Sequence, residues 1–113
     1  MKKLEIIIRP EKLDVLKKIL LKNNYVGMTV FAVMGCGHQK GVIKEFSGIG
    51  LPDINLLPKI YIMTVVREGD VENILADIHE GLSTGEVGDG KVFVSEIVDV
   101  MRIRTGDKGE KTL

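Results

Sequence analysis

The apolar residues of this chain follow two spacings, and each spacing predicts a type of secondary structure. Four segments have runs or strict alternation of β-branched and other apolar residues, which is typical of strands. They are Leu4–Ile8, Met28–Met34, Lys59–Arg67 and Val92–Val98. Two further segments have apolar residues three and four positions apart, as on one face of a helix. These are Leu13, Leu16, Ile19 and Leu20 in the first, and Val71, Ile74, Leu75, Ile78 and Leu82 in the second.

The helix boundaries are marked by residues with known positional preferences. Pro10 suits the first turn of a helix, where its missing N–H is not needed. The pair Asn23-Asn24 and then Gly27 are expected to end that helix. Asp70 follows a turn and is expected to cap the second helix with its side chain.

The predicted order of strand, helix, strand, strand, helix, strand is that of an α+β, ferredoxin-like βαββαβ domain. Two helices then cover one face of an antiparallel sheet. The strands are apolar on both faces: Tyr61, Met63 and Val65 alternate with Ile60 and Ile62. Two helices cover only one face, so we expect the open face to be buried in a cyclic oligomer. The 113 residues fit one domain, 1–113.

Glycine interrupts these patterns in two places. The segment Gly35–Pro58 contains five glycines and two prolines and has no helical or strand period. A long segment without regular structure inside a small domain is usually functional, so we expect an exposed functional loop there. The second glycine-rich segment, Gly85–Gly90, precedes the last strand.

Composition excludes several classes of function. Sixteen basic and sixteen acidic residues give a net charge of zero, and only 4% of residues are aromatic. A nucleic-acid binder or an anionic-membrane binder needs a basic surface, so neither is expected. The single Cys36 excludes an internal disulfide. Since neither a signal peptide nor a membrane-spanning run is recognisable, we expect a cytoplasmic protein without direct membrane insertion.

The second glycine segment formally fits the GxxxxGK pattern with Gly85, Gly90 and Lys91. Val92 replaces the Ser or Thr of a P-loop and a strand follows it, so a Walker P-loop is rejected. Glycine N–H groups and Lys91 could still bind phosphate, helped by Arg102 and Arg104 if these share one side of an extended strand. Turn glycines and solvated surface cations are the simpler alternative. The two histidines lack metal-ligand spacing, and no catalytic arrangement stands out.

Motifs spread over nearly the whole chain resemble the PII nitrogen-regulatory proteins. They are Lys2–Leu13, Gly27-Met28-Thr29-Val30, Gly-x-Gly-x-Gln-Lys-Gly at 35–41, Leu57-Pro58-Lys59, Thr84–Val94 with Gly88-Asp89-Gly90-Lys91, and Arg102-Ile103-Arg104-Thr105-Gly106. The resemblance implies a homotrimer, or a trimer mixed with a paralogue, whose ATP or ADP sites lie between subunits. It assigns the nucleotide to Thr29, Gly37, His38, Gln39, Gly88, Asp89, Gly90, Lys91, Arg102 and Arg104.

The same resemblance implies a second effector and a partner-binding loop. Gln39 would ligand Mg²⁺ bridging ATP and 2-oxoglutarate, which Lys59 and the backbone around Lys40 and Gly41 would bind. A T-loop at about 38–57 would dock on an ammonium transporter, a nitrogenase or an enzyme of nitrogen metabolism. Its docking residues would be Phe46, Ile49, Leu51 and Ile54, and a C-terminal tail covers about 102–113. The implied role is a non-enzymatic sensor.

The chain departs from the family pattern at the loop. Cys36 and His38 stand where arginines are usual, which weakens or remakes one phosphate contact. The loop tyrosine that the family modifies is absent, since Tyr25 and Tyr61 lie outside it. Gly-Cys-Gly resembles the nitrogenase-associated branch. Two alternatives remain open: a nucleotide sensor that does not respond to 2-oxoglutarate, and a slow ATPase.

Overall fold

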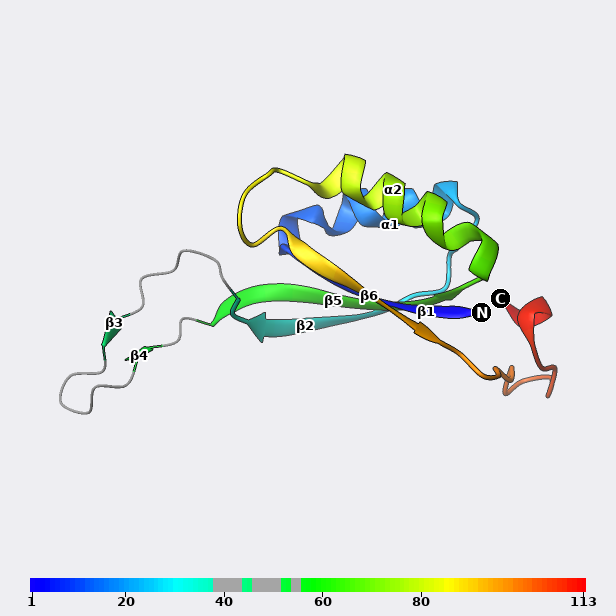
Figure 1. Cartoon of the computed structure of the whole chain (residues 1–113). Coiled ribbons are helices and arrows are strands. Elements are labelled where there is room, and N and C mark those ends of the chain that lie inside the picture. The colour runs from blue at the N-terminus through cyan, green and yellow to red at the C-terminus, as the bar shows by residue number, and fades with distance from the viewer. Residues whose placement is uncertain (38–43, 46–51, 54–55) are drawn as a thin grey trace.

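The computed structural model describes residues 1–37, 44–45, 52–53 and 56–113 (Figure 1). Its main strands are β1 (Lys2–Ile8), β2 (Thr29–Gly35), β5 (Leu57–Val66) and β6 (Gly90–Glu96), and its helices are α1 (Leu13–Lys22) and α2 (Val71–Leu82). Short 3₁₀ turns are Pro10–Lys12, Glu68–Asp70 and Glu110–Thr112. The predicted α+β, ferredoxin-like arrangement is confirmed.

The four main strands form one antiparallel sheet in the order β2-β5-β1-β6. Because β1 lies inside the sheet, Ile6 stands opposite Ile62 on one side and Val92 on the other. Both helices lie on the same face of this sheet (Figure 1). The register brings the end of β1 at Ile8 beside the start of β6 at Gly90.

The core lies between this face and the two helices. Alternate residues of β1 are buried because the period of a strand is two, and the apolar faces of α1 and α2 pack against them. The buried apolar side chains are Leu4, Ile6, Ile8, Leu16, Ile19, Leu20, Tyr25, Ile62, Val66, Val71, Ile74, Ile78 and Leu82.

The opposite face of the sheet is also largely apolar, as predicted, although Glu5 lies on it opposite Phe93. Phe31, Tyr61 and Phe93 belong to it, and the rings of Phe31 and Tyr61 pack with centroids 5.7 Å apart. Phe31 and Phe93 are about half exposed. Burial of this face in an oligomer stays a prediction.

The predicted side-chain cap of the second helix by Asp70 is wrong. Asp70 does occupy the N-cap position but makes no capping hydrogen bond. Its carboxylate accepts a hydrogen bond from the buried Tyr25 hydroxyl, which in turn accepts one from the Arg67 N–H at 2.9 Å. Burial and the Asp70 contact raise the pKa of Tyr25. Asp70 therefore ties the helix start to the chain after α1.

The predicted extended strand carrying Arg102 and Arg104 is also wrong. β6 ends at Glu96, and a turn follows in which the Gly106 N–H donates to the Arg102 carbonyl at 2.8 Å. Arg102 and Arg104 therefore do not share a strand face. In the first glycine-rich segment, which we predicted to lack regular structure, Lys44–Glu45 (β3) pairs with Pro52–Asp53 (β4).

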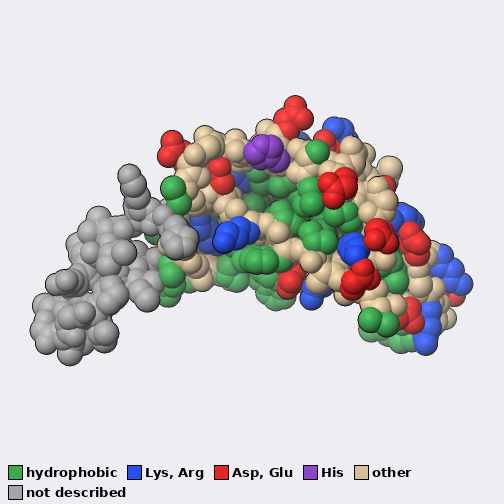
Figure 2. Space-filling view, in the orientation of Figure 1, with side chains coloured by type: hydrophobic (Ala, Val, Ile, Leu, Met, Phe, Trp, Pro, Cys, Tyr) green, Lys and Arg blue, Asp and Glu red, His purple; other side chains and the backbone are tan. Residues whose placement is uncertain are grey.

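Hydrophobic side chains gather in the middle of the face that Figure 2 shows, below α2 and over β6. They surround a hollow of about 230 Å³ lined by Leu75, Ile78, Leu82 and Val92 among others. Within the described ranges, neither helix has the length and apolar character needed to cross a bilayer.

Candidate functional site

A cleft of about 370 Å³ opens at the end of the sheet where β1 stops and β6 starts. Its walls come from the ends of four elements and from the turn before β6. The lining residues are Ile7, Gly35, Cys36, Gly37, Lys59, Val87, Gly88, Gly90, Lys91 and Phe93. The cleft thus combines two glycine-rich segments with two lysines and an apolar floor.

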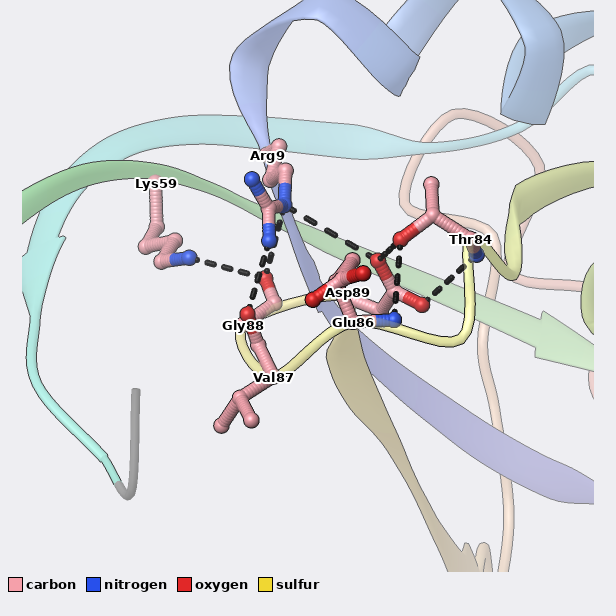
Figure 3. A network of polar contacts seen from close by, with 7 residues as sticks. All are labelled: Arg9, Lys59, Thr84, Glu86, Val87, Gly88 and Asp89. Carbon is pink, nitrogen blue, oxygen red and sulfur yellow. Dashed lines mark hydrogen bonds and ion pairs between the residues drawn. The ribbon is translucent and has the colours of Figure 1, made fainter. Parts of the chain in front are cut away.

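The turn between α2 and β6, residues 84–90, is held by its own side chains (Figure 3). The carboxylate of Asp89 accepts hydrogen bonds from the Thr84 N–H at 2.7 Å and the Thr84 hydroxyl at 2.5 Å. The Glu86 N–H donates to the same hydroxyl oxygen at 3.2 Å. These contacts to Thr84 hold the pKa of Asp89 below its usual value, although burial opposes them. Asp89 therefore stays ionised and closes the turn.

Gly90 meets the strictest steric requirement in this region. Its φ is +113°, and a Cβ built on it would lie 1.8 Å from the carbonyl oxygen of Ile7. A real Cβ cannot approach a backbone oxygen so closely, and L-residues rarely adopt this φ. Only glycine allows β6 to start against β1 in this geometry.

Two cations hold the carbonyl side of the same turn (Figure 3). Lys59 is 8% exposed and its ammonium donates to the Gly88 carbonyl at 3.0 Å. The Arg9 guanidinium donates to the Val87 carbonyl at 2.8 Å and to the Gly88 carbonyl at 3.2 Å. Lys91 is exposed at the start of β6. Positive charge and glycine N–H groups together favour phosphate or carboxylate ligands.

The structure brings part of the predicted site together. Five of the predicted residues line the cleft: Gly37, Lys59, Gly88, Gly90 and Lys91. Asp89 lies beside it but uses both carboxylate oxygens on Thr84. The predicted residues His38, Gln39, Lys40, Gly41, Phe46, Ile49, Leu51 and Ile54 lie outside the described residues.

Three other predicted residues lie away from the cleft of their own chain. Thr29 begins β2, whereas Gly35 at the cleft ends it, so about 20 Å of strand separates them. Arg102 and Arg104 follow the far end of β6, close to where β1 begins, since the Ile97 N–H donates to the Met1 carbonyl. One chain therefore carries two groups of predicted nucleotide-binding residues at opposite ends of its sheet.

Sequence reasoning missed Arg9, Ile7 and Phe93. The topology contained a signal for Arg9: in a ferredoxin-like sheet the first and last strands are neighbours and antiparallel. The residue after the first strand must then lie beside the turn that precedes the last one, as Arg9 does beside Asp89.

The fold and the site together define a class of protein: a ferredoxin-like domain whose cleft beside β6 is lined by glycines and lysines. The family model described as nitrogen regulatory protein P-II matches residues 1–107. A nitrogen regulatory protein P-II of Synechocystis is 43% identical over 113 residues, covering all of both chains. Nitrogen regulatory protein P-II 2 of Methanothermobacter thermautotrophicus is 42% identical over 113 residues, covering 100% of this chain and 97% of its own. The protein from Pyropia yezoensis is 45% identical over 107 residues, 95% of either chain. This chain belongs to the P-II nitrogen regulatory protein family.

Proposed function

We propose that this protein is a sensor that binds ATP or ADP together with 2-oxoglutarate and regulates a target protein of nitrogen metabolism. The observation that carries the proposal is the cleft in which Gly37, Gly88, Gly90, Lys59 and Lys91 meet. Glycine N–H groups and ammonium groups bind anions, and both effector classes are polyanions at neutral pH. The family membership supports a regulatory role.

The nucleotide phosphates occupy the side of the cleft formed by the turn 84–90 and Lys91. Arg102, Arg104 and Thr29 reach this site from a neighbouring copy, because within one chain they lie at the other end of the sheet. A cyclic trimer supplies such neighbours, and it buries the open apolar face that includes Phe31 and Phe93. The site is then shared between subunits.

2-Oxoglutarate binds next to the phosphates, with a carboxylate on Lys59. No cluster of three or more His, Cys, Asp or Glu side chains suited to a metal occurs among the described residues. Gln39, which the family resemblance assigns to the metal, would hold Mg²⁺ beside the nucleotide and 2-oxoglutarate. The ion would supply positive charge and oxygen-binding sites next to both effectors, which would explain why 2-oxoglutarate requires Mg-ATP.

The segment 38–57 transmits the ligand state to the target. A target responds only when it binds the ligand states with different affinities, and a coupling of about 1–3 kcal/mol gives roughly 5–150-fold control. The target classes are an ammonium transporter, a nitrogenase or an enzyme of nitrogen metabolism. The protein acts by binding, without a reaction of its own.

Calorimetric titration of 2-oxoglutarate tests the proposal, with Mg-ATP, with ADP and without nucleotide. Binding is expected only with Mg-ATP. Lys59→Ala should abolish 2-oxoglutarate binding and leave ATP binding nearly unchanged, because only 2-oxoglutarate needs that ammonium group. Lys17→Ala, on the exposed surface of α1, is the control for loss of one positive charge.

Three outcomes contradict parts of the proposal. No 2-oxoglutarate binding in any state would favour a nucleotide sensor without that response. Loss of ATP and 2-oxoglutarate together in Lys59→Ala would refute the separate role of Lys59. Steady ATP turnover that Lys91→Ala removes would establish an ATPase instead.

A further inference from the structure

Arg9 contacts three consecutive residues of the turn that faces the cleft, and the proposed function leaves it without a role. Its guanidinium lies 2.8 Å from the Val87 carbonyl oxygen, 3.2 Å from that of Gly88 and 3.9 Å from the carboxylate of Asp89. The side chain is 27% exposed, so water only partly screens these contacts. All three contacts lie on one side of the turn (Figure 3).

We infer that Arg9 is the positioning residue of the anion cleft: it holds the turn 84–90 in the shape that binds phosphate. The inference rests on the proposed function, because it assigns the turn to phosphate. Arginine suits this task because its planar fork reaches two carbonyl oxygens at once. A lysine at the same position is a single point donor and could serve only one of them well.

The direction of the peptide groups explains how Arg9 acts without touching the ligand. A trans peptide points its C=O and its N–H in opposite directions. Holding the Val87 and Gly88 carbonyls toward Arg9 therefore turns the N–H groups of Gly88 and Asp89 away from the guanidinium. Of the two, the Gly88 N–H makes no hydrogen bond to the backbone of the described residues, which leaves it available to an anion.

Lys59 alone cannot hold the turn during a binding cycle. It donates to the same Gly88 carbonyl, at 3.0 Å, but the proposed function also gives it the carboxylate of 2-oxoglutarate. When Lys59 turns to that carboxylate, Arg9 Nε keeps the Gly88 carbonyl satisfied. Arg9 therefore lets the second effector bind without loss of the nucleotide-binding shape.

Amide hydrogen exchange on the nucleotide-free protein tests the positioning role directly. The reporters are the N–H groups of Thr84 and Glu86, which are hydrogen-bonded within the turn. In Arg9→Met they should exchange about tenfold faster, the change expected from losing one charge-assisted hydrogen bond. Arg9→Lys should lie between Arg9→Met and the unchanged protein. Amides in the centre of β1 and in α2 should be unaffected.

Arg67→Met is the matched control. Arg67, like Arg9, ends a strand segment in extended conformation and precedes a 3₁₀ turn, but its side chain pairs with Glu110 at the other end of the sheet. It should leave the Thr84 and Glu86 exchange rates unchanged. Faster exchange throughout Arg9→Met would indicate a general structural role and overturn the inference, as would unchanged exchange in the turn.

Titration with ATP and with ADP completes the experiment. Arg9→Met should raise both dissociation constants about tenfold, Arg9→Lys less, and Arg67→Met not at all. Weaker binding with unchanged exchange would mean that Arg9 contacts the ligand itself, and would refute the positioning role. If the unchanged protein binds neither nucleotide, the proposed function fails, and the exchange rates still decide whether Arg9 holds the turn.

Discussion

Replacing Gly90 by alanine tests whether the glycine at the start of β6 is imposed by geometry. The new Cβ would lie 1.8 Å from the Ile7 carbonyl oxygen, and the residue would keep a φ near +113°. A backbone conformation of this kind costs a non-glycine residue about 1–3 kcal/mol. The contact is with backbone, so side-chain rotation cannot relieve it, and the β1–β6 pairing at Ile8 must open. Losing that pairing adds about 1 kcal/mol, which brings the expected loss of unfolding free energy to about 2–4 kcal/mol.

Substitutions at two other glycines separate the cost of backbone strain from the cost of the steric contact with Ile7. Gly85 has a φ of +79° and nothing within 4 Å of its built Cβ, so Gly85→Ala measures backbone strain alone, about 1–2 kcal/mol. Gly69 has open space and no positive φ, and Gly69→Ala should stay within about 0.5 kcal/mol. The difference between Gly90→Ala and Gly85→Ala is then the cost of the contact with Ile7.

Urea unfolding followed by circular dichroism gives these free energies, with all variants at one protomer concentration because the proposed association would contribute to stability. Equal destabilisation by Gly90→Ala and Gly85→Ala would refute the steric argument. A Gly90→Ala protein as stable as the unchanged chain would also refute the strain argument.

Three further predictions concern the core, the turn and the nucleotide site. Leu20→Ala should cost about 2–5 kcal/mol in urea unfolding, because Leu20 is fully buried. Its neighbour Leu21 is 61% exposed, so Leu21→Ala should change the stability by less than about 0.5 kcal/mol. The pKa of Asp89 is lowered in the fold, so its contribution to the turn is complete above the unfolded value of 3.8 and is lost as the pH falls through the lower folded pKa. The Thr84 N–H, which donates to the Asp89 carboxylate, should therefore still exchange slowly below pH 3.8. In Asp89→Asn the exchange rate of this amide should no longer change as the pH falls through the pKa of Asp89. Lys91→Ala and Arg102→Ala should each weaken ATP and ADP together in calorimetry, and a loss confined to one nucleotide would contradict their assignment to shared phosphates.

The sequence predicted the elements well because packing and local pattern agree there. The stripes of α1 and α2 and the alternation in β1 are the residues found in the core. Asp70 shows where local reasoning ends: its N-cap position was predicted, but its carboxylate is taken by Tyr25, 45 residues earlier in the chain. A contact at that sequence distance has no signature in a local pattern.

The candidate site was predictable to the extent that glycines and lysines stand in recognisable segments. Gly37, Lys59 and Lys91 line one cleft only because of the order of the strands in the sheet. The predicted βαββαβ topology specifies that order, so it is the part of the prediction that brings these residues together. The prediction that Arg102 and Arg104 lie on an extended strand was wrong. Alternation of charged residues does not distinguish a strand from a turn closed by backbone hydrogen bonds. Arg9 was missed because an arginine before a proline carries no chemical signal by itself.

The separation of Lys91 from Arg102 within one chain has a genetic consequence. In the ring of identical chains that we propose, each site would take its lysine from one copy and its arginine from the next. A ring that contains one Lys91→Ala chain and one Arg102→Ala chain can then have a site built from the two unaltered halves. Two defective alleles expressed together would complement each other in part, whereas the double variant expressed alone would not.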